Sequence, residues 1–470
     1  MGGGGRSHVV LFMVLATTII GGESRESGYF LDAEEEEYMA TSCRDYAVSV
    51  ERFGAVGDGV TSNTKAFKDA IEHLRQVNSS GGVLLYVPAG RFVTGSFNVT
   101  SHFTLYLHRH AVLLGSQNME EWPLIEPLPS YGRGRDAAGP RYSSLINGHN
   151  LTDVIITGNN GTIDGQGENW WKLFRSGKLD HTRGYLIEIQ YTDQILISDI
   201  TLVNSPAWNI HPVYSTNIVV SGVTITAPVD SPNTDGINPD SCSQVLIQDS
   251  YVVSGDDCIA IKSGWDEYGI AVGIPSKEIA IKRFTCITPD SAAIALGSEM
   301  SGGIKDVRAE DVTVVSCKSG IRIKTAVGRG NYVKDIFVRG MTLKKTMKWV
   351  FWMGGDYGDH PDDQYDPKAI PMVDNINYSD IVAENAVMAG KLDGIENAPF
   401  TGICISNATI DVVPSKLLIW NCTNVSGIAS GVTPKPCPAL STVGEAPPCS
   451  FPENRLAIED VQFRQCMIKL

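Results

Sequence analysis

A short pattern recurs along the middle of this chain: one polar residue, then apolar, any and apolar residues. The copies are Asp153–Ile156, Gln194–Ile197, Asn217–Val220, Gln244–Ile247, Glu278–Ile281, Asp306–Ala309 (an imperfect copy) and Asp335–Val338. From Ile195 onward the spacings are 23, 27, 34, 28 and 29 residues. We call one such repeat a lap, meaning one turn of a coiled sheet. Laps of this length, with β-branched strands and with Gly, Asn and Asp at the corners, predict that successive turns stack on one another and share one core. We therefore expect an all-β fold, a right-handed parallel β-helix, since a β-propeller would have a longer period and turn-aromatic signatures.

The first residues are typical of a secretory signal peptide. A positive start is followed by the short apolar run Val9–Ile20 and by small residues. That run is too short to span a membrane comfortably. We predict a signal peptide at residues 1–24, a solvated acidic leader at 25–46, and a secreted, extracellular protein with no membrane association after cleavage. Eight N-x-S/T sequons agree with export: Asn78, Asn98, Asn150, Asn160, Asn377, Asn407, Asn421 and Asn424.

An amphipathic helix is predicted just before the repeats. Ser62 or Asn63 can cap it. Its apolar face at helical spacing contains Ala66, Phe67, Ala70, Ile71 and Leu74. We expect this short helix to cap the N-terminal end of a β-helix at residues 47–425. Beyond it the chain is rich in proline and loses its period, so residues 426–470 are predicted to form a separate C-terminal tail.

The cysteine content and the net charge limit which cellular compartment and which classes of partner are compatible with this chain. Five of the ten cysteines lie late in the chain and indicate a disulfide-tied end, because no C-x-x-C pair has companion histidines for zinc. These are Cys404, Cys422, Cys437, Cys449 and Cys466. A net charge of −15 argues against nucleic acid as a partner. A polyanion would need a cleft with its own cations, because solvent screens charge beyond about 8 Å.

Three acids are predicted to meet in space. Asp235 precedes the pair Asp256 and Asp257 by about one lap, and laps stack at roughly 4.8 Å. Two carboxylates about 5 Å apart repel by roughly 3 kcal/mol, or about two pKa units. One acid should therefore hold its proton beside ionised neighbours, which glycosidic cleavage requires. Ordinary turn acids and calcium ligands are the alternatives.

Two cations are predicted to face the same groove. Arg322 and Lys324 lie two residues apart, so they share one face of a strand. Arginine binds carboxylates in bidentate fashion, so the pair suggests a sugar that carries a carboxylate. The alternative is that these cations only neutralise the acids. Trp208, Trp265 and Tyr332 are candidates for stacking on sugar faces, although core packing explains most of the tryptophans.

Several motifs together resemble the polygalacturonases, the pectin-hydrolysing family 28 of the glycoside hydrolases. They are F-G-A-V-G-D-G from Phe53, T-I-D-G-Q-G from Thr162, N-T-D-G from Asn233, G-D-D from Gly255 and R-I-K from Arg322. The resemblance covers roughly residues 47–425. The runs S-Y-G-R-G-R and I-K-S-G-W-D-E-Y-G are similar to a plant-like branch related to exo-acting enzymes.

The resemblance implies a role for each candidate. Asp256 would protonate the leaving oxygen, and Asp235 and Asp257 would activate water with inversion; an inverting pair needs roughly 6.5–9.5 Å, which a diagonal step between laps can provide. Arg322 and Lys324 would hold a galacturonate carboxylate. Asn233 and Tyr332 are further candidates for substrate binding, and Cys258 and Cys286 would bridge. The implied protein is a monomer that acts on pectic galacturonan in the cell wall, with no metal and no cofactor.

One position departs from the family pattern. Where the family has G-H-G, this chain has Ser291 or Ala292, and loss of a positioned proton-handling group costs on the order of 10²- to 10⁴-fold. His211, one lap before Asp235, could compensate. Hydrolysis of α-1,4-linked galacturonan is the leading hypothesis. The alternatives are an impaired homologue that only binds pectin and a calcium-dependent pectate lyase, and the sequence does not separate endo from exo action.

Overall fold

The computed structural model describes residues 38–40, 43–442, 448–464 and 466–468. The predicted signal peptide and most of the predicted acidic leader lie outside the described residues. The end of that leader is not a solvated arm, because Arg44 forms a 2.6 Å ion pair with Asp153 and its side chain is 3% exposed. No helix within the described ranges has the length and apolar character that crossing a membrane requires.

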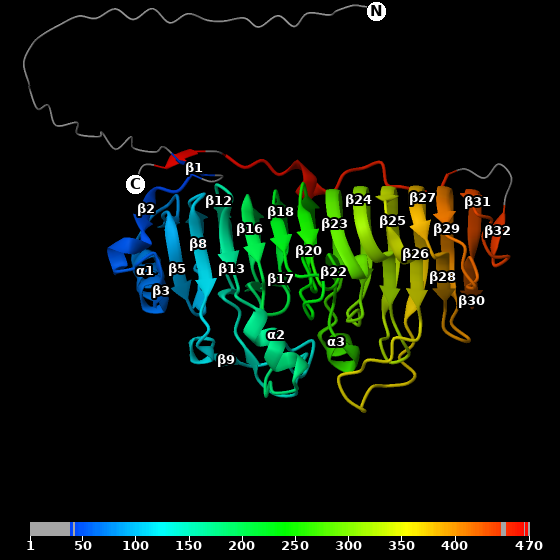
Figure 1. The fold of residues 1–470 in the computed structure, drawn as a ribbon, viewed down its shortest axis with the longest axis horizontal. Helices are drawn as coiled ribbons and strands as arrows, with labels where there is room; N and C mark the ends of the chain where they lie inside the picture. Colours follow the sequence, from blue (N-terminus) through cyan, green and yellow to red (C-terminus); the bar gives the residue numbers. More distant parts are fainter. Residues whose placement is uncertain (1–37, 41–42, 443–447, 465, 469–470) are drawn as a thin grey trace, which may run out of the picture. The chain divides into compact units, whose positions relative to one another are not determined.

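The described residues coil into a parallel β-helix, as the repeat predicted (Figure 1). Parallel strands pair from lap to lap in three columns. The column that carries the site contains β6 (Phe97–Asn98), β11 (Ile146–His149), β14 (Ile187–Gln190), β17 (Ile210–Val213), β22 (Ile259–Ile261), β26 (Thr346–Gly354), β28 (Met388–Asp393) and β30 (Trp420–Thr423).

The second column carries the sequence repeat. It contains β2 (Tyr46–Ser49), β4 (Val83–Val87), β7 (Phe103–Leu107), β12 (Thr152–Gly158), β15 (Asp193–Ser198), β18 (Thr216–Ser221), β20 (Ser243–Gln248), β25 (Tyr332–Leu343), β27 (Met372–Ala386), β29 (Phe400–Val412), β31 (Val425–Thr433) and β32 (Leu440–Thr442). The third column contains β3 (Asp58–Ser62), β5 (Gly90–Thr94), β8 (Ala111–Gly115), β13 (Gly161–Asp164), β16 (Ile200–Val203), β19 (Thr224–Thr226) and β21 (Tyr251–Val253). The long strands β23 (Ser276–Leu296) and β24 (Ile304–Lys324) bend through the columns.

The remaining elements are short and lie at the ends and the rim. They are the helices α1 (Thr64–Gln76), α2 (Glu168–Arg175) and α3 (Asp266–Val272), the 3₁₀ turns η1 (Val50–Phe53), η2 (Met119–Glu121) and η3 (Ala457–Asp460), and the antiparallel pairs β1 (Tyr38–Ala40) with β33 (Cys466–Ile468) and β9 (Leu124–Ile125) with β10 (Arg141–Tyr142). The run after Gly264 contains α3.

The polar residue of the repeat has a structural cause. In all seven copies this residue has a left-handed backbone, with φ between 51° and 64°. Asn and Asp, which occupy four of the seven positions, tolerate this conformation better than most residues because their short side chains bond locally. The bend directs the apolar residues that follow into the core.

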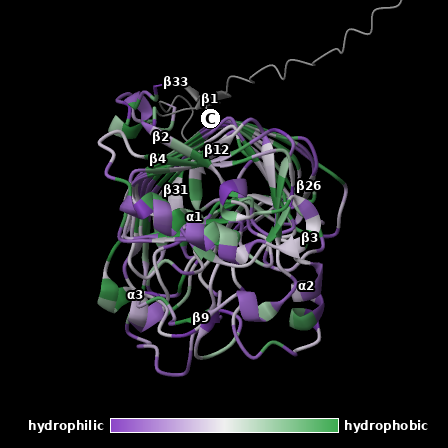
Figure 2. Cartoon of the chain, turned by 90° about the vertical axis from the view of Figure 1, so that its left-hand side faces the viewer, coloured by the Kyte–Doolittle hydropathy of each residue, from purple (hydrophilic) through white to green (hydrophobic). Residues whose placement is uncertain are grey.

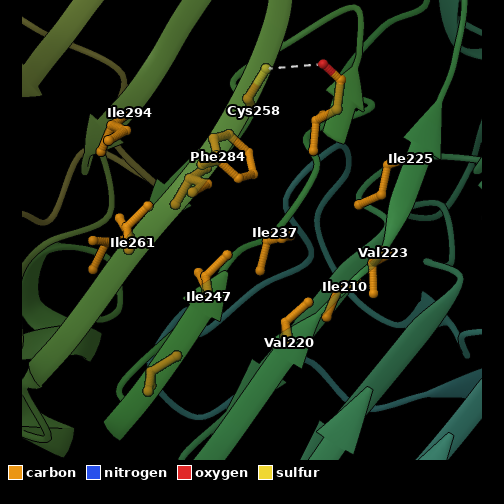
Figure 3. Close-up of a cluster of buried hydrophobic side chains, with 14 of the residues drawn as sticks. Ile210, Val220, Val223, Ile225, Ile237, Ile247, Cys258, Ile261, Phe284 and Ile294 are labelled. Atoms are coloured by element: carbon orange, nitrogen blue, oxygen red, sulfur yellow. Dashed lines mark hydrogen bonds between the residues drawn. The ribbon is translucent and has the colours of Figure 1, made fainter. Parts of the chain in front are cut away.

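Isoleucines stack from lap to lap inside the coil. Ile210 pairs with Ile237, Ile237 with Ile259, and Ile259 with Ile294, and all are at most 2% exposed. Figure 3 shows Ile210, Ile237 and Ile294 in one buried cluster with Phe284. Burial of apolar area in a continuous column stabilises the stack and fixes its register, because a slip of one residue would turn every side chain outward.

The two ends of the coil are closed differently. Helix α1 lies across the N-terminal end (Figure 2) and begins after Asn63, with its five predicted face residues buried, as expected. At the other end the coil continues past residue 425, because β31 and β32 pair with β29 and with each other. Pro434, Pro436 and Pro438 fall in the connection between those two strands, where no ladder bond is needed.

Four disulfides are present among the described residues. Cys258–Cys286 is the bridge that the resemblance implied. Cys404–Cys449 and Cys422–Cys437 tie the late cysteines, and Cys43–Cys466 joins positions 423 residues apart. Cys242 and Cys317 are buried and free. The expectation of a disulfide-tied end is therefore confirmed.

Candidate active site

Strand register brings the three predicted acids together. Ile237 pairs with Ile259 on the next lap, so Asp235 and Asp257, each two residues earlier, occupy matching positions on adjacent laps. One carboxylate oxygen from each of Asp235, Asp256 and Asp257 lies within 4.8 Å of the other two. The nearest carboxylate oxygens therefore lie closer together than the gap of roughly 6.5–9.5 Å expected of an inverting pair.

The three acids differ in burial. Asp235 is 3% exposed and Asp257 is 1% exposed, whereas Asp256 is only partly buried. Asp235 accepts a hydrogen bond from Asn238 Nδ2 at 3.1 Å. Asp257 accepts from Lys324 Nζ at 2.5 Å and from the Ala292 backbone N–H at 3.0 Å. Asp256 is thus the acid most open to a substrate.

Burial and nearby charge shift the pKa of two acids in opposite directions. Burial raises the pKa of Asp235 well above its usual value, and the charge of Asp256 adds to the rise. Burial acts the same way on Asp257, but the cations of Lys324 and Arg322 outweigh it and lower the pKa of Asp257. The cluster therefore holds a proton at mildly acidic pH while Asp257 stays ionised.

A cavity of ≈ 230 Å³ opens in front of the acids. Asn233, Arg322 and Lys324 line it together with the three acids. Asn233 Nδ2 lies 3.4 Å from Asp256 Oδ2, and its Oδ1 accepts from Arg183 at 2.7 Å. The structure thus brings these three predicted substrate contacts into one site.

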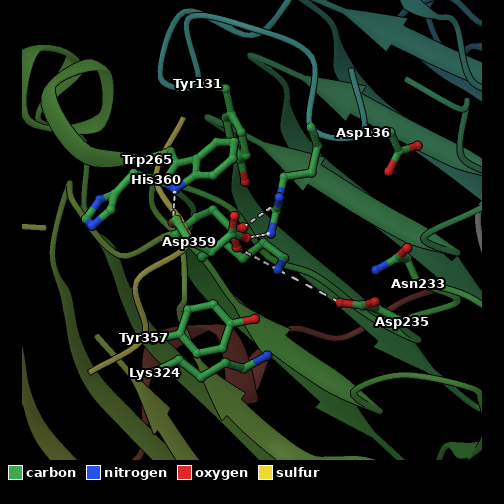
Figure 4. Close-up of polar contacts among 12 residues, drawn as sticks. Tyr131, Asp136, Asn233, Asp235, Trp265, Lys324, Tyr357, Asp359 and His360 are labelled. Atoms are coloured by element: carbon green, nitrogen blue, oxygen red, sulfur yellow. Dashed lines mark hydrogen bonds and ion pairs between the residues drawn. The ribbon is translucent and has the colours of Figure 1, made fainter. Parts of the chain in front are cut away.

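Tyr332 does not line this cavity. It lies at the start of β25 against Gly303, with the Lys334 ammonium 5.0 Å from its ring centroid. Tyr357, which the sequence analysis missed, lines the cavity instead, with Arg322 5.4 Å and Lys324 5.8 Å from its ring centroid. Figure 4 shows Tyr357 beside Lys324, across the site from Asn233 and Asp235.

A chain of ion pairs leads from Asp235 to the rim, and the sequence analysis missed it too. Lys262 Nζ lies 3.9 Å from Asp235 and 2.9 Å from Glu299. Glu299 lies 2.8 Å from Arg135, which lies 2.6 Å from Asp359. Burial would raise the pKa of Glu299, but Lys262 and Arg135 lower it well below its usual value. Glu299 is therefore an anion that holds both cations in place.

Three long segments of the rim interlock beside the cavity. Segments 116–144 and 355–371 meet through Arg135 and Asp359, and Arg133 Nη1 donates to the Pro361 carbonyl at 2.8 Å. The α3 segment joins them, since Tyr268 OH donates to Asp362 at 2.9 Å. Arg135, Asp136 and Tyr357 from two of these segments line the cavity. The interlocked segments therefore form a wall of the site.

Two predicted sugar-stacking rings are covered by other groups. Trp265 is 2% exposed, its Nε1 donates to the Asp359 carbonyl at 2.9 Å, and Arg135 covers its face at 4.4 Å. Trp208 is 5% exposed and stacks on Tyr185 with 4.7 Å between ring centroids. The stacking hypothesis is therefore wrong for Trp265, and the Trp208 face serves packing.

His211 does not face the acid cluster. Its ring is fully buried, with Nε2 3.4 Å from Asp240 and Nδ1 3.9 Å from Glu188. Glu188 also forms a bidentate pair with Arg141 at 2.6 Å. His211 belongs to a buried structural network, so the idea that it replaces the missing family histidine is wrong.

Ser291, one of the two residues at the departing position, contacts two acids. Its hydroxyl lies 2.8 Å from Asp256 Oδ1 and 2.6 Å from Asp257 Oδ1. The Ala292 side chain is buried next to Ala260 and Ala295, away from this contact. Strand register explains the placement, because Ile259 pairs with Ile294 and so aligns residues 256 and 291.

Residues 85–433 match the family "Glycosyl hydrolases family 28". Residues 47–108 match "Rhamnogalacturonase A/epimerase, pectate lyase-like". A "Probable polygalacturonase" from Vitis vinifera is 60% identical over 461 residues, covering 97% of this chain and 93% of that protein. A "Polygalacturonase" from Persea americana is 24% identical and covers 81% and 77%.

Solved structures give the same fold. An exopolygalacturonase from Thermotoga maritima has a TM-score of 0.68 at 26% identity and covers 80% of this chain and 92% of its own. The polygalacturonase from Erwinia carotovora has a TM-score of 0.63 at 22% identity and covers 82% and 96%. The likeness extends over most of the coil.

Proposed function

Because this chain belongs to family 28 of the glycosyl hydrolases, we propose that it hydrolyses α-1,4-galacturonosidic bonds of pectic polysaccharide. One observation carries the proposal: three acids and the cations Arg322 and Lys324 face one cavity. Acids cleave a glycosidic bond, and cations at the same place suit a sugar with its own carboxylate. The relative from Vitis vinifera, 60% identical, is named as a probable polygalacturonase.

In the proposed mechanism Asp256 is the general acid, because it is the most exposed of the three. Asp256 gives its proton to the glycosidic oxygen as the bond from that oxygen to the anomeric carbon breaks. A water molecule held by Asp235 and Asp257 attacks that carbon, and its proton passes to one of these two carboxylates. The cluster returns to its starting state when one proton moves back to Asp256.

We propose that the configuration at the anomeric carbon is inverted. The carboxylates of Asp235 and Asp257 already accept bonds from Asn238, Lys324 and Ala292. Anchored carboxylates of this kind are suited to orienting a water molecule and are poorly placed to move onto the sugar as nucleophiles. The short separation of the acids is atypical for inversion, so the product anomer is a direct test.

We propose exo action, with the chain end of the polymer entering a closed site. The cavity of ≈ 230 Å³ is smaller than the roughly 300–1,000 Å³ of typical small-molecule pockets. Its wall is built by interlocked rim segments, and the similar structure from Thermotoga maritima is an exopolygalacturonase. Such a site accepts the end of a chain more readily than its middle.

We propose an extracellular location, where pectic polysaccharide is the partner. Four disulfides support an oxidising compartment, since such bonds are rare in the cytosol. Seven of the eight sequon asparagines are at least partly exposed, which suits glycosylation during export. Asn377 is the exception at 5% exposure, and its side chain bonds Asn375.

Product sizing from a defined oligogalacturonate at mildly acidic pH tests the function. The expected product is monomer alone, and Asp256→Asn should lower kcat on the order of 10²- to 10⁴-fold. A ladder of products would contradict exo action but not hydrolysis. No reducing ends above the Asp256→Asn control, with binding retained, would favour the pectin-binding alternative.

The lyase alternative requires a calcium site, and the charges in the cavity oppose one. Ammonium groups of Lys324 and Lys262 face the carboxylates of Asp257 and Asp235 at 2.5 and 3.9 Å, where a calcium ion would be repelled. An unsaturated, ultraviolet-absorbing product that disappears with a chelator would overturn this assignment.

A further inference from the structure

We propose that the Ser291 hydroxyl is a positioning group that keeps Asp256 protonated and Asp257 ionised. This inference rests on the proposed function and adds a residue to its machinery. Ser291 is 5% exposed and lies within hydrogen-bond distance of one oxygen from each acid. It is one of the two residues, with Ala292, that stand where the family resemblance led us to expect a histidine.

The single proton of the Ser291 hydroxyl determines which of the two acids is protonated. A serine hydroxyl has one proton to donate and two lone pairs that accept, yet Ser291 Oγ touches two carboxylate oxygens, at 2.6 and 2.8 Å. Asp257 takes the donated proton, because it has the shorter contact and is held as an anion by Lys324. The second contact is then favourable when Asp256 carries a proton, since two unprotonated oxygens at that distance would repel.

Backbone contacts hold the arrangement rigid. The Ala292 N–H donates to Asp257 Oδ1 at 3.0 Å, and Thr288 Oγ1 donates to the Asp256 carbonyl at 2.7 Å. The residues on either side of Ser291 therefore fix the serine relative to both acids. The hydroxyl can rotate toward Asp256 once that acid has given up its proton.

Other titratable groups line the cavity with the two acids, and substituting Ser291 leaves them in place. They include Asp235, Lys262, Asp290, Arg322, Lys324 and Tyr357, and farther along the cavity Arg135, Asp136, Tyr185 and Glu299. These groups set where the pH profile lies. A change at Ser291 alters only the contacts of its hydroxyl with Asp256 and Asp257.

The test is the bell-shaped pH profile of kcat/KM for Ser291→Ala on an oligogalacturonate. Loss of the acceptor makes the proton on Asp256 easier to remove and moves the alkaline limb down by about one pH unit, whereas the acid limb, which Asp235 sets, stays in place. The profile therefore narrows from the alkaline side, and kcat falls about 10- to 100-fold with little change in KM. Ser291→Cys, of similar size with a weak donor, should narrow the profile too.

Thr288→Val is the matched control, because it removes a bond to the backbone of Asp256 and leaves both carboxyl contacts. Its profile should keep the wild-type width even if kcat falls. An active wild type with an unchanged profile, or with both limbs shifted together, in the serine variants overturns this inference. An inactive wild type contradicts the proposed function instead. In that case ¹³C NMR titration of aspartate-labelled protein, assigned with Asp256→Asn, still tests whether the two pKa values converge in Ser291→Ala.

Discussion

Replacing Lys262 by Met should make the base of the site harder to ionise. The Lys262 ammonium lies 3.9 Å from Asp235 Oδ2, and both side chains are about 95% buried. At that distance and an effective dielectric near 20, the attraction is about 4 kcal/mol, equivalent to about three pKa units. Water entering the space of the lost ammonium would reduce the effect, so we expect the pKa of Asp235 to rise by about one to three units.

The fold should tolerate this change. Glu299, the other partner of Lys262, keeps its 2.8 Å pair with Arg135 and is not left alone in the interior. Met has nearly the shape of the lysine stem and can keep its contact with Trp208, over which the ammonium lies at 4.5 Å. Unchanged thermal unfolding to within about 1–2 kcal/mol would confirm that any kinetic effect is electrostatic.

The assay is kcat/KM for reducing-end release across the acidic and neutral range. Because Asp235 must be ionised to act as a base, a raised pKa moves the acid limb to higher pH, with the alkaline limb little changed. Lys391→Met is the control: it removes the same charge from a 3.1 Å pair with Asp393 on β28. An acid limb that stays in place, or that moves to lower pH, would refute the role of Lys262.

Three other expectations follow from the structure. Asp240 and Glu188 raise the pKa of His211 despite its burial. The protonated ring therefore contributes fully to the free energy of unfolding below about pH 6.5, and this contribution is lost as pH rises through the raised pKa. His211→Gln should lower the free energy of unfolding by about 3 kcal/mol at acidic pH and show a flatter pH dependence of Tm. Removing the Cys43–Cys466 disulfide with a double serine variant should lower the free energy of unfolding by about 2–4 kcal/mol, measured by denaturant unfolding. An unchanged midpoint would show that this disulfide does not stabilise the fold. The first product anomer, followed by ¹H NMR, should be β, and an initial α-anomer would indicate retention.

The sequence predicted the features that repeat or lie on regular strands. The copies of the repeat predicted the column from β12 to β25, and the face of α1 predicted its buried side. The acids Asp235, Asp256 and Asp257 were found because one lap of sequence separates them. Arg322 and Lys324 were found for a related reason, since alternation along a strand puts them on one side.

The sequence did not predict what irregular segments bring to the site. Tyr357 reaches the cavity through segment 355–371, which has no period, so Tyr332 was chosen in its place. Lys262 and Glu299 are a pair across 37 residues that only the register of the laps reveals. The sequence also did not predict how close the acids lie, because the register that aligns Asp235 with Asp257 on the next lap is visible only in the structure.

The two edges of the coil differ in how well they can accept an inserted segment. At one edge, single left-handed residues make the bends before the repeat strands, so no extra residue fits there. At the other edge, α2, α3 and segment 355–371 extend away from the coil (Figure 1). Grafting a foreign rim segment onto that second edge should redirect the protein to another polysaccharide while the scaffold stays intact. The same graft placed at a bend would have to break the stack to fit.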